Sequence, residues 1–186
     1  MNIPVLVYLT SWIVLSPFYL IQPVLPDINN LNQDTMIIEY HPIGEFHSNL
    51  TPKTGAPRQG ILQPETQGTI EIRKEYYEAL KDLGQYEYII VLYHMHLSRK
   101  WHSHVRPPGS KRSFGLFATR SPNRPNPVGF AVIRLNEING TILHVSGIDA
   151  YDGTPVLDIK PWLPSIDCPS DKTHLEIESE LGLGKV

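Results

Sequence analysis

The sequence has almost no cysteine: Cys168 is the single one in 186 residues. One cysteine excludes an internal disulfide and any zinc site built from several thiolates. This composition fits a reducing compartment, and we expect a cytoplasmic protein. Cys168 lies in an Asp-Cys-Pro sequence. An isolated thiol of this kind is expected to be a bystander rather than a nucleophile.

The chain also lacks a glycine-rich nucleotide-binding loop. No G-x-G-x-x-G follows a predicted strand, and the nearest candidate, Gly182-x-Gly184, stands at the very end with no helix after it. The common Rossmann-type cofactor site is therefore excluded. An enzyme of this sequence that binds a nucleotide cofactor must build the site in another way.

Acidic residues are missing from residues 99–124, which hold seven Lys and Arg. The net charge of the chain is −3, and the remainder carries nine basic and nineteen acidic residues. A segregated basic segment binds phosphates by releasing counterions, while the acidic remainder keeps the protein soluble. The segment predicts a nucleic-acid-binding surface; a solvated basic loop is the alternative interpretation.

Charge of either sign is absent from residues 1–26, which are largely apolar and long enough to span a bilayer. No Lys or Arg orients this stretch, and no A-x-A cleavage site follows it. We expect residues 1–35 to be a leader outside the fold. A membrane-associating segment and a cleaved signal peptide remain the alternatives, and no membrane partner is expected unless residues 1–26 are a genuine anchor.

Seventeen prolines and thirteen glycines indicate many turns and few long helices. Alternation, apolar runs and turn residues predict six strands, a polar loop over residues 46–60 and a helix over 74–83 that Gly84 ends. The predicted strands cover residues 37–40, 69–72, 88–93, 129–135, 141–145 and 156–159. The sequence therefore predicts a mainly β protein, a β-barrel or strongly curved sheet with one or two short helices. One domain over 36–170 and an acidic tail over 171–186 are expected.

Residues 117–129 read F-A-T-R-S-P-N-R-P-N-P-V-G. Three prolines fix φ and remove backbone donors, so this stretch is neither a helix nor a central strand. Arg120 and Arg124 lie in it with no acid nearby. A stiff loop that holds guanidinium groups suits binding of phosphate or carboxylate, because little entropy is lost on binding. An ordered surface turn is the plainer interpretation.

This motif, together with D-G-T-P-V-L-D-I-K-P at residues 152–161, resembles the TsaA-like (TrmO) family over residues 36–167. The resemblance implies an S-adenosylmethionine-dependent methyltransferase acting on N6 of threonylcarbamoyl-adenosine, next to the tRNA anticodon. It also implies a β-barrel, usually a homodimer, in the cytoplasm. The chain ends soon after residues 161–164, without the C-terminal extension expected of longer members.

The resemblance implies the candidate site residues. Cofactor contacts are expected from the P-R-Q motif, the end of strand 88–93, the proline-rich loop and the 147–152 loop: Pro57, Arg58, Gln59, His94, Met95, Arg120, Phe130, Ile148, Asp149, Ala150 and Tyr151. Contacts to tRNA are expected from Arg99, Lys100, Arg106, Lys111, Arg112, Arg124 and Lys160. Trp101 is a candidate platform for a splayed-out base, or else a core tryptophan. Lys160 has a plain surface lysine as its alternative.

Methyl transfer from a sulfonium to an amine mainly requires alignment of donor and acceptor and exclusion of water. The cationic sulfur needs an aromatic face, such as Tyr93 or Tyr151, or carbonyl oxygens. The exocyclic adenine nitrogen must lose a proton, which calls for an acceptor. Asp149 and Asp152 are the catalytic candidates, although Asp152-Gly153 also has the composition of a plain turn.

Two other functions are compatible with the sequence. His94 and His96 alternate on one strand, His102 and His104 repeat the H-x-H spacing, and Asp149 is a third candidate ligand for a metal-dependent hydrolase. We expect no metal, because the resembling family uses none. A non-catalytic tRNA-binding module needs the basic loop but no cofactor. Cofactor binding therefore discriminates among the three functions.

Overall fold

The structure is a computed structural model that describes residues 37–168 and 179–181. The predicted leader, residues 1–35, and most of the acidic tail lie outside the described residues. Residues from Glu39 onward belong to one compact unit. None of the helices in the described ranges is long and apolar enough to cross a membrane.

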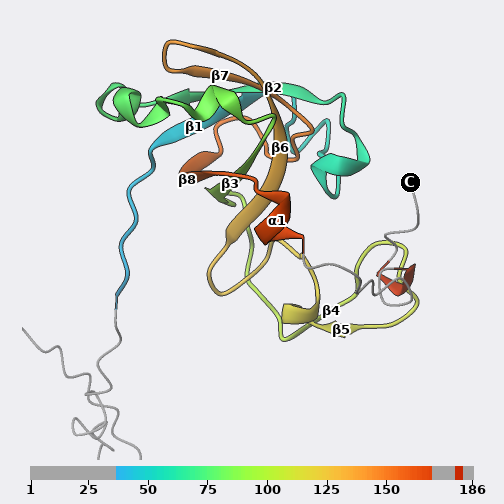
Figure 1. The fold of residues 1–186 in the computed structure, drawn as a ribbon. Helices are drawn as coiled ribbons and strands as arrows, with labels where there is room; N and C mark the ends of the chain where they lie inside the picture. The colour runs from blue at the N-terminus through green and yellow to red at the C-terminus, as the bar shows by residue number, and fades with distance from the viewer. Residues whose placement is uncertain (1–36, 169–178, 182–186) are drawn as a thin grey trace, which may run out of the picture. The chain divides into compact units, whose positions relative to one another are not determined.

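Six strands of this unit close into a barrel in which every neighbouring pair is antiparallel (Figure 1). The order around the barrel is β1-β2-β7-β6-β3-β8. The strands are β1 (Gly44–Ser48), β2 (Gln67–Ile72), β3 (Tyr88–His94), β6 (Val128–Asn139), β7 (Ile142–Ser146) and β8 (Pro155–Pro161). The predicted β-barrel is confirmed.

The barrel core is formed by inward-facing aliphatic side chains and two aromatic rings. Ile89, Val91 and Tyr93 alternate along β3 into this core, and Ile90 is also buried. This explains the unbroken apolar run that predicted the strand. Gly140 and Thr141 make the turn between β6 and β7, one residue later than the predicted Asn-Gly turn, and Gly140 has a φ of 60° that favours glycine.

The start of the barrel differs from the sequence expectation. Residues 37–40, predicted as a strand, form none, and β1 begins later, at Gly44. A Cβ at Gly44 would lie 2.5 Å from the Glu71 carbonyl oxygen, so glycine is what allows β1 and β2 to approach here. Phe46, 1% exposed, then enters the core. The prediction of a polar loop from residue 46 was therefore wrong for residues 46–48.

The predicted helix over residues 74–83 is shorter and tighter than expected. It is the 3-10 helix η3 (Lys74–Leu80), followed by a second short one, η4 (Leu83–Gln85). Asp82 adopts a left-handed conformation with φ 65° between them. The chain therefore breaks before Gly84, and the predicted stop was wrong. The short α-helix α1 (Pro164–Asp167) follows β8.

The chain leaves the barrel after β3 and returns at β6, and residues 95–127 between them, which include the basic segment, are called the excursion below. The excursion contains β4 (His104–Val105) and β5 (Phe114–Gly115), which pair with each other in a separate sheet, and the 3-10 helix η5 (Leu116–Ala118). Figure 1 shows this excursion outside the barrel. Phe114 and Leu116 are buried, which anchors an otherwise exposed segment.

Candidate functional site

The site forms around the loop that follows β7. Ile148 and Ala150 are 0% and 3% exposed and belong to the barrel core, so they anchor the loop from inside. Asp149 lies between them and is half-buried. Gly147 has a φ of 72°, which turns the chain out of β7. The loop therefore holds one carboxylate at the edge of the core.

A glycine contact brings the P-R-Q motif to this loop. A Cβ at Gly60 would lie 1.8 Å from the Gly147 carbonyl oxygen. The backbones of the two loops therefore touch in a way that no other residue at position 60 allows. The backbone of Gly60 also forms a hydrogen bond with the Asp149 carboxylate. Gly60 directly follows Gln59, so the motif is held beside Asp149.

The carboxylate of Asp149 has a partner on β3. The Tyr93 hydroxyl donates to Asp149 Oδ1 at 2.9 Å. Burial raises the pKa of Asp149 above its usual value, while the hydrogen bonds from Tyr93 and Gly60 and the charge of Arg120 act in the opposite direction. Burial, and then the charge of Asp149, raise the pKa of Tyr93. The tyrosine therefore stays protonated and remains a donor.

The proline-rich loop supplies a cation to the same place. An Arg120 nitrogen, Nη1, donates to Gln59 Oε1, and the charge of Arg120 acts on both Tyr93 and Asp149. Gln59 Nε2 in turn donates to the Arg58 carbonyl oxygen at 2.7 Å. Three motifs far apart in the sequence thus contribute Gln59, Arg120 and Asp149 to one site.

The remaining predicted cofactor residues surround this site less directly. His94 is exposed at the end of β3, and the backbone N–H of Met95 donates to the Pro127 carbonyl oxygen at 2.8 Å, which ties β3 to the proline-rich loop. Phe130 is 47% exposed on β6. Pro57 and Tyr151 are half-buried. Arg58 Nη2 donates to the Leu181 carbonyl oxygen at 2.8 Å.

The ring of Tyr93, a candidate aromatic face for a sulfonium, is buried in the core. The tyrosine is 7% exposed, and its ring meets Phe46 edge-on with centroids 5.8 Å apart. The ring is thus occupied by core contacts, and only the hydroxyl serves the site. Tyr151, the other candidate, is half-buried and so less buried than Tyr93. The hydroxyl role had no sequence signal beyond the position of Tyr93 at the end of a buried strand.

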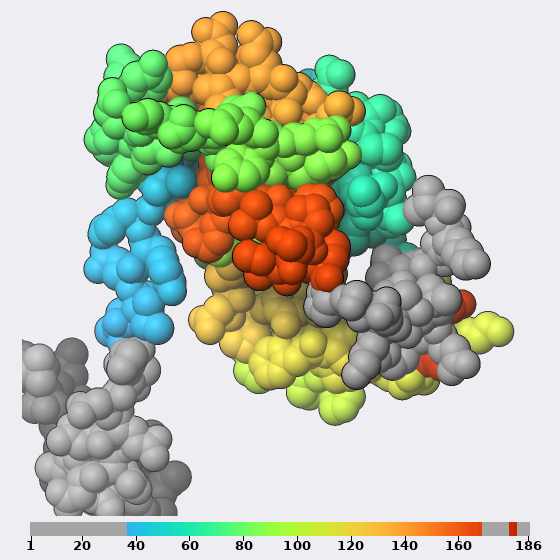
Figure 2. Space-filling model, viewed as in Figure 1, coloured from blue at the N-terminus to red at the C-terminus, as the bar shows by residue number. Residues whose placement is uncertain are grey.

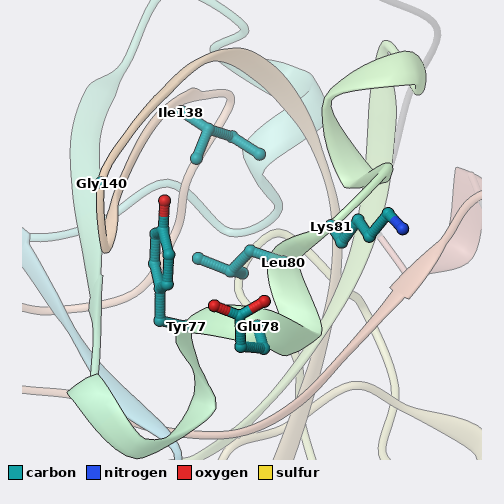
Figure 3. A pocket seen from close by; sticks show the side chains of 6 residues that line it. All are labelled: Tyr77, Glu78, Leu80, Lys81, Ile138 and Gly140. Carbon is teal, nitrogen blue, oxygen red and sulfur yellow. The ribbon is translucent and has the colours of Figure 1, made fainter.

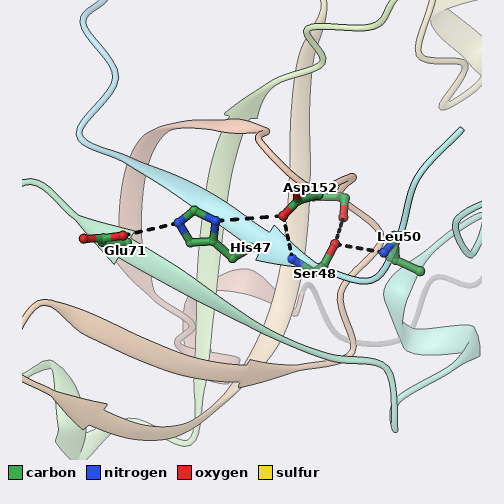
Figure 4. Close-up of polar contacts among 6 residues, drawn as sticks. His47, Ser48, Leu50, Glu71 and Asp152 are labelled. Carbon is green, nitrogen blue, oxygen red and sulfur yellow. Dashed lines mark hydrogen bonds and ion pairs between the residues drawn. The ribbon is translucent and has the colours of Figure 1, made fainter.

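Asp152, the second catalytic candidate, lies in a different set of contacts (Figure 4). Its Oδ1 accepts the Ser48 backbone N–H at 3.0 Å and lies 3.8 Å from His47 Nδ1. His47 Nε2 is 3.4 Å from Glu71 Oε2. The Asp152 backbone N–H donates to the Leu50 carbonyl oxygen at 2.9 Å. This carboxylate is exposed and fastens the 152 loop to the end of β1.

The predicted tRNA-contacting residues are exposed except Arg124, which is half-buried, and all but Lys160 lie on the excursion: Arg99, Lys100, Arg106, Lys111, Arg112 and Arg124. Figure 2 shows part of the excursion, in yellow-green to yellow, on the surface of the molecule. Lys160 lies on β8 and pairs with Asp158. Arg112 Nη2 is 2.5 Å from Glu180 Oε2.

Two aromatic side chains stand out on this surface. Trp101 is 47% exposed, so the core alternative for it was wrong. Phe117 is 78% exposed, and the Arg124 guanidinium lies 5.5 Å from its ring centroid. Arg124 Nη1 also donates to the Thr119 carbonyl oxygen at 3.0 Å. Sequence reasoning named the motif that contains Phe117 but missed the exposed ring.

The histidine pairs do not assemble a metal site in the described ranges. No group of three or more His, Cys, Asp or Glu side chains there could hold a metal ion. His96 Nδ1 is 3.4 Å from the Thr154 hydroxyl oxygen, and His104 Nδ1 is 3.2 Å from that of Ser103. His96 and His104 therefore each have a hydroxyl neighbour.

A pocket of about 360 Å³ lies between η3 and the turn that joins β6 to β7 (Figure 3). Its lining combines Leu80 and Ile138 with the ends of Tyr77 and Glu78. None of the predicted cofactor, catalytic or tRNA residues lines it. The pocket is thus separate from the cluster around Asp149.

A closed antiparallel barrel, a site built from its loops and a basic excursion define a class of protein distinct from the Rossmann-fold nucleotide-binding proteins. The profile of the tRNA-methyltransferase O N-terminal domain matches residues 45–168. The chain therefore belongs to the tRNA-methyltransferase O family, as the motifs predicted.

Relatives and solved structures agree with this assignment. A probable S-adenosyl-L-methionine-binding protein of Pyrococcus abyssi is 41% identical over 132 residues, which are 71% of this chain and 72% of the relative. A mouse tRNA (adenine(37)-N6)-methyltransferase is 33% identical over 165 residues, 84% of this chain and 36% of the relative. The crystal structure of TrmO from Pseudomonas aeruginosa superposes with a TM-score of 0.64 at 36% identity, covering 74% of this chain.

The matched region is only part of some of these proteins. This chain covers 61% of the solved Pseudomonas chain and about a third of the mouse relative. The match therefore concerns the barrel domain that the family profile describes.

Proposed function

We propose that this protein is an S-adenosylmethionine-dependent tRNA methyltransferase that methylates N6 of threonylcarbamoyl-adenosine next to the anticodon. The observation that carries the proposal is the cluster of Gln59, Arg120, Asp149 and Tyr93, which brings three family motifs to one place. The adenine-37 N6 activity in the name of the mouse relative supports the position and the atom. The threonylcarbamoyl group comes from the family resemblance.

The residues present suit S-adenosylmethionine. Its methionine part carries a carboxylate, which the Arg120 guanidinium can bind through two nitrogens. Gln59 offers an amide to polar groups of the adenosine, and the half-buried Tyr151 ring offers a face to the sulfonium. We therefore place the cofactor across the P-R-Q motif, Arg120 and the 148–151 loop.

When bound, the cofactor supplies the methyl group: the N6 lone pair forms the new N–C bond as the C–S bond breaks, and its electrons stay on sulfur. The chain must align the two partners and accept the N6 proton. We assign the proton to Asp149, because its carboxylate is half-buried and its pKa is raised. Asp152 is exposed and holds the loop through Ser48.

The excursion is proposed to bind the anticodon loop. Arg99, Lys100, Arg106 and Lys111 present positive charge to phosphates, and Trp101 offers a surface on which an unstacked base can stack. The target base lies in a single-stranded loop, so it is presented without opening a duplex. In this proposal the barrel loops bind the cofactor, and the excursion binds the tRNA substrate.

Assembly, location and domain boundaries are proposed with the function. The homodimer and the cytoplasmic location follow from the family resemblance, and light scattering on purified protein tests the first. We also propose that residues 36–170 are the functional domain, because the family profile begins at residue 45.

The decisive experiment incubates the purified full chain with methyl-labelled S-adenosylmethionine and tRNA that carries or lacks the threonylcarbamoyl group. We expect label in N6 of the modified adenosine only. Label in both tRNAs contradicts the proposed substrate. Cofactor binding without label in either tRNA contradicts the reaction, and tRNA binding without cofactor binding identifies a non-catalytic RNA-binding module.

A further inference from the structure

Tyr93 is held by close contacts with two neighbouring strands. A Cβ at Gly129, its direct partner on β6, would lie 2.1 Å from the ring, so the ring lies against the glycine backbone. Phe46 meets the ring from β1 at an interplanar angle of 85°. Contacts from two strands therefore fix the plane of the ring and the direction of its hydroxyl.

The fixed hydroxyl meets a carboxylate that has few other charged or titratable neighbours. Among the described residues, the charged and titratable groups that act on Asp149 are Tyr93 and Arg120, and the backbones of Gly60 and of Asp149 itself add hydrogen bonds. Arg120 belongs to a loop and also bonds Gln59, whereas Tyr93 belongs to the barrel wall. The hydrogen bond of 2.9 Å from Tyr93 is thus the link between Asp149 and a rigid element.

We propose that Tyr93 is a positioning residue for Asp149: its hydroxyl sets the orientation of the carboxylate that accepts the N6 proton. The inference rests on the proposed function for the identity of the reaction, but the link itself concerns the folded chain alone. A base that is held by a buried donor needs no reorientation when substrate arrives, which lowers the barrier to proton transfer.

The hydroxyl is not required for packing. Phenylalanine keeps the ring, its fit over Gly129 and its contact with Phe46, and it removes only the donor to Asp149. Removing that donor leaves the half-buried carboxylate with one hydrogen bond fewer. Tyr93→Phe is therefore a test of orientation with little change in volume.

The kinetic experiment compares Tyr93→Phe with Tyr88→Phe in the full chain. Tyr88 lies five residues earlier on β3, and its ring packs edge-on against Trp162, so it undergoes the same change on the same strand. For Tyr93→Phe we expect kcat to fall about 10- to 100-fold, with the KM for tRNA and the cofactor Kd nearly unchanged. The acid limb of the kcat profile should move to higher pH. Tyr88→Phe should match the parent protein.

A second measurement is independent of catalysis. The titration of the Asp149 carboxyl carbon is followed by NMR in the parent protein and in both variants, without cofactor or tRNA. We expect the pKa of Asp149 to rise in Tyr93→Phe, because the lost hydrogen bond favoured the ionised form, and to stay in place in Tyr88→Phe.

The two measurements separate the inference from the function it rests on. If the pKa of Asp149 shifts in Tyr93→Phe, the hydrogen-bond link between Tyr93 and Asp149 is supported. If the parent protein at the same time transfers no methyl group, the proposed reaction is rejected while the link stands. An unshifted titration, or a kcat for Tyr93→Phe equal to that of Tyr88→Phe, overturns the positioning role even if methyl transfer is observed.

Discussion

Burial of Asp149 lowers the stability of the folded chain when the carboxylate is ionised, and it makes the same carboxylate more basic. The fold surrounds its carboxylate with Ile148 and Ala150, which belong to the core, and supplies hydrogen bonds that offset only part of the cost of ionisation. Burial is the largest influence and raises the pKa of the group. A carboxylate in this condition is a better proton acceptor than an exposed one, because its basicity is closer to neutral pH.

We predict that Asp149→Asn loses most of its activity but is more stable. The amide cannot accept the N6 proton, so kcat should fall by about 10²–10⁴-fold. The amide still accepts from Tyr93 and needs no ionisation, so the folded state should gain stability. The melting temperature at pH 7 should rise by about 2–4 °C for each kcal/mol of ionisation cost removed. Thermal unfolding and single-turnover methyl transfer measure the two effects.

The pH dependence of this stability difference has a definite sign. Because the folded pKa of Asp149 is raised above its unfolded value, the stability contribution of the protonated group is fully present below the unfolded pKa and is lost as pH rises through the folded pKa. The advantage of Asp149→Asn should therefore appear as pH rises and vanish in acid. An advantage that is constant with pH would contradict the burial argument.

We predict that Arg120→Lys acts on the cofactor, whereas Lys111→Ala acts on tRNA. Lysine keeps the charge but loses the planar fork that contacts Gln59, so cofactor affinity or turnover should fall about tenfold. Lys111→Ala should leave cofactor affinity unchanged and reduce the slope of log tRNA affinity against log salt by about one unit. Calorimetry measures the cofactor affinity of each variant, and a salt series measures its tRNA affinity. If the two variants behave identically, Arg120 contributes only positive charge to a basic surface, and the prediction is wrong.

At the scale of elements, the site depends on how closely two loops approach. The P-R-Q loop lies beside the Asp149 loop because Gly60 has no side chain that would clash with the Gly147 carbonyl oxygen. The proline-rich loop is attached to the end of β3 through the Met95–Pro127 backbone hydrogen bond. Glycine contacts and backbone hydrogen bonds thus fix the positions of the loops relative to the barrel.

We predict that Gly60→Ala separates these loops. The added Cβ would lie 1.8 Å from a backbone oxygen, so the loop must shift at a cost of about 1–3 kcal/mol. Cofactor affinity should fall with it, because Gln59 moves away from Arg120. Gly115→Ala is the matched control, since a Cβ there has nothing within 4 Å and its φ is −57°. Equal cofactor affinity for both variants would show that the glycine contact is unimportant for the site.

At the scale of the whole molecule, basic and acidic residues are separated by the topology. The chain leaves the barrel after β3 and returns at β6, and every Lys and Arg of residues 99–124 lies on this excursion, which has no acidic residue. A net charge of −3 therefore coexists with a positive surface. Such an arrangement favours association with RNA at one face only.

We predict that a chain beginning at Met36 keeps the cofactor affinity and the tRNA affinity of the full chain. The barrel starts with Gly44 and the family profile at residue 45, and every candidate site residue named above follows them. Calorimetry with S-adenosylmethionine and a filter-binding titration with tRNA make the comparison. A shortened chain that is folded by circular dichroism but binds neither ligand would contradict the prediction.

Local patterns in the sequence were sufficient for the barrel and for the motifs. The apolar run before His94, the alternation of β2 and the Asn-Gly sequence report on neighbours along the chain. The structure confirms the two strands and places the hairpin turn at Gly140 and Thr141, one residue later than predicted. The same local reasoning failed at residues 37–48, where the position of β1 depends on Gly44 meeting Glu71. It also misplaced the helix end, because Asp82 rather than a glycine takes the left-handed conformation.

Only the tertiary structure decided how the site residues are partnered. The family resemblance named Asp149, Gln59 and Arg120 as candidates, because a resemblance is read from motifs along the chain. It did not connect Tyr93 to Asp149, which lie 56 residues apart and meet only when the barrel closes. Burial and hydrogen bonding come from packing between distant segments, and these determine which carboxylate is basic and which one fastens a loop.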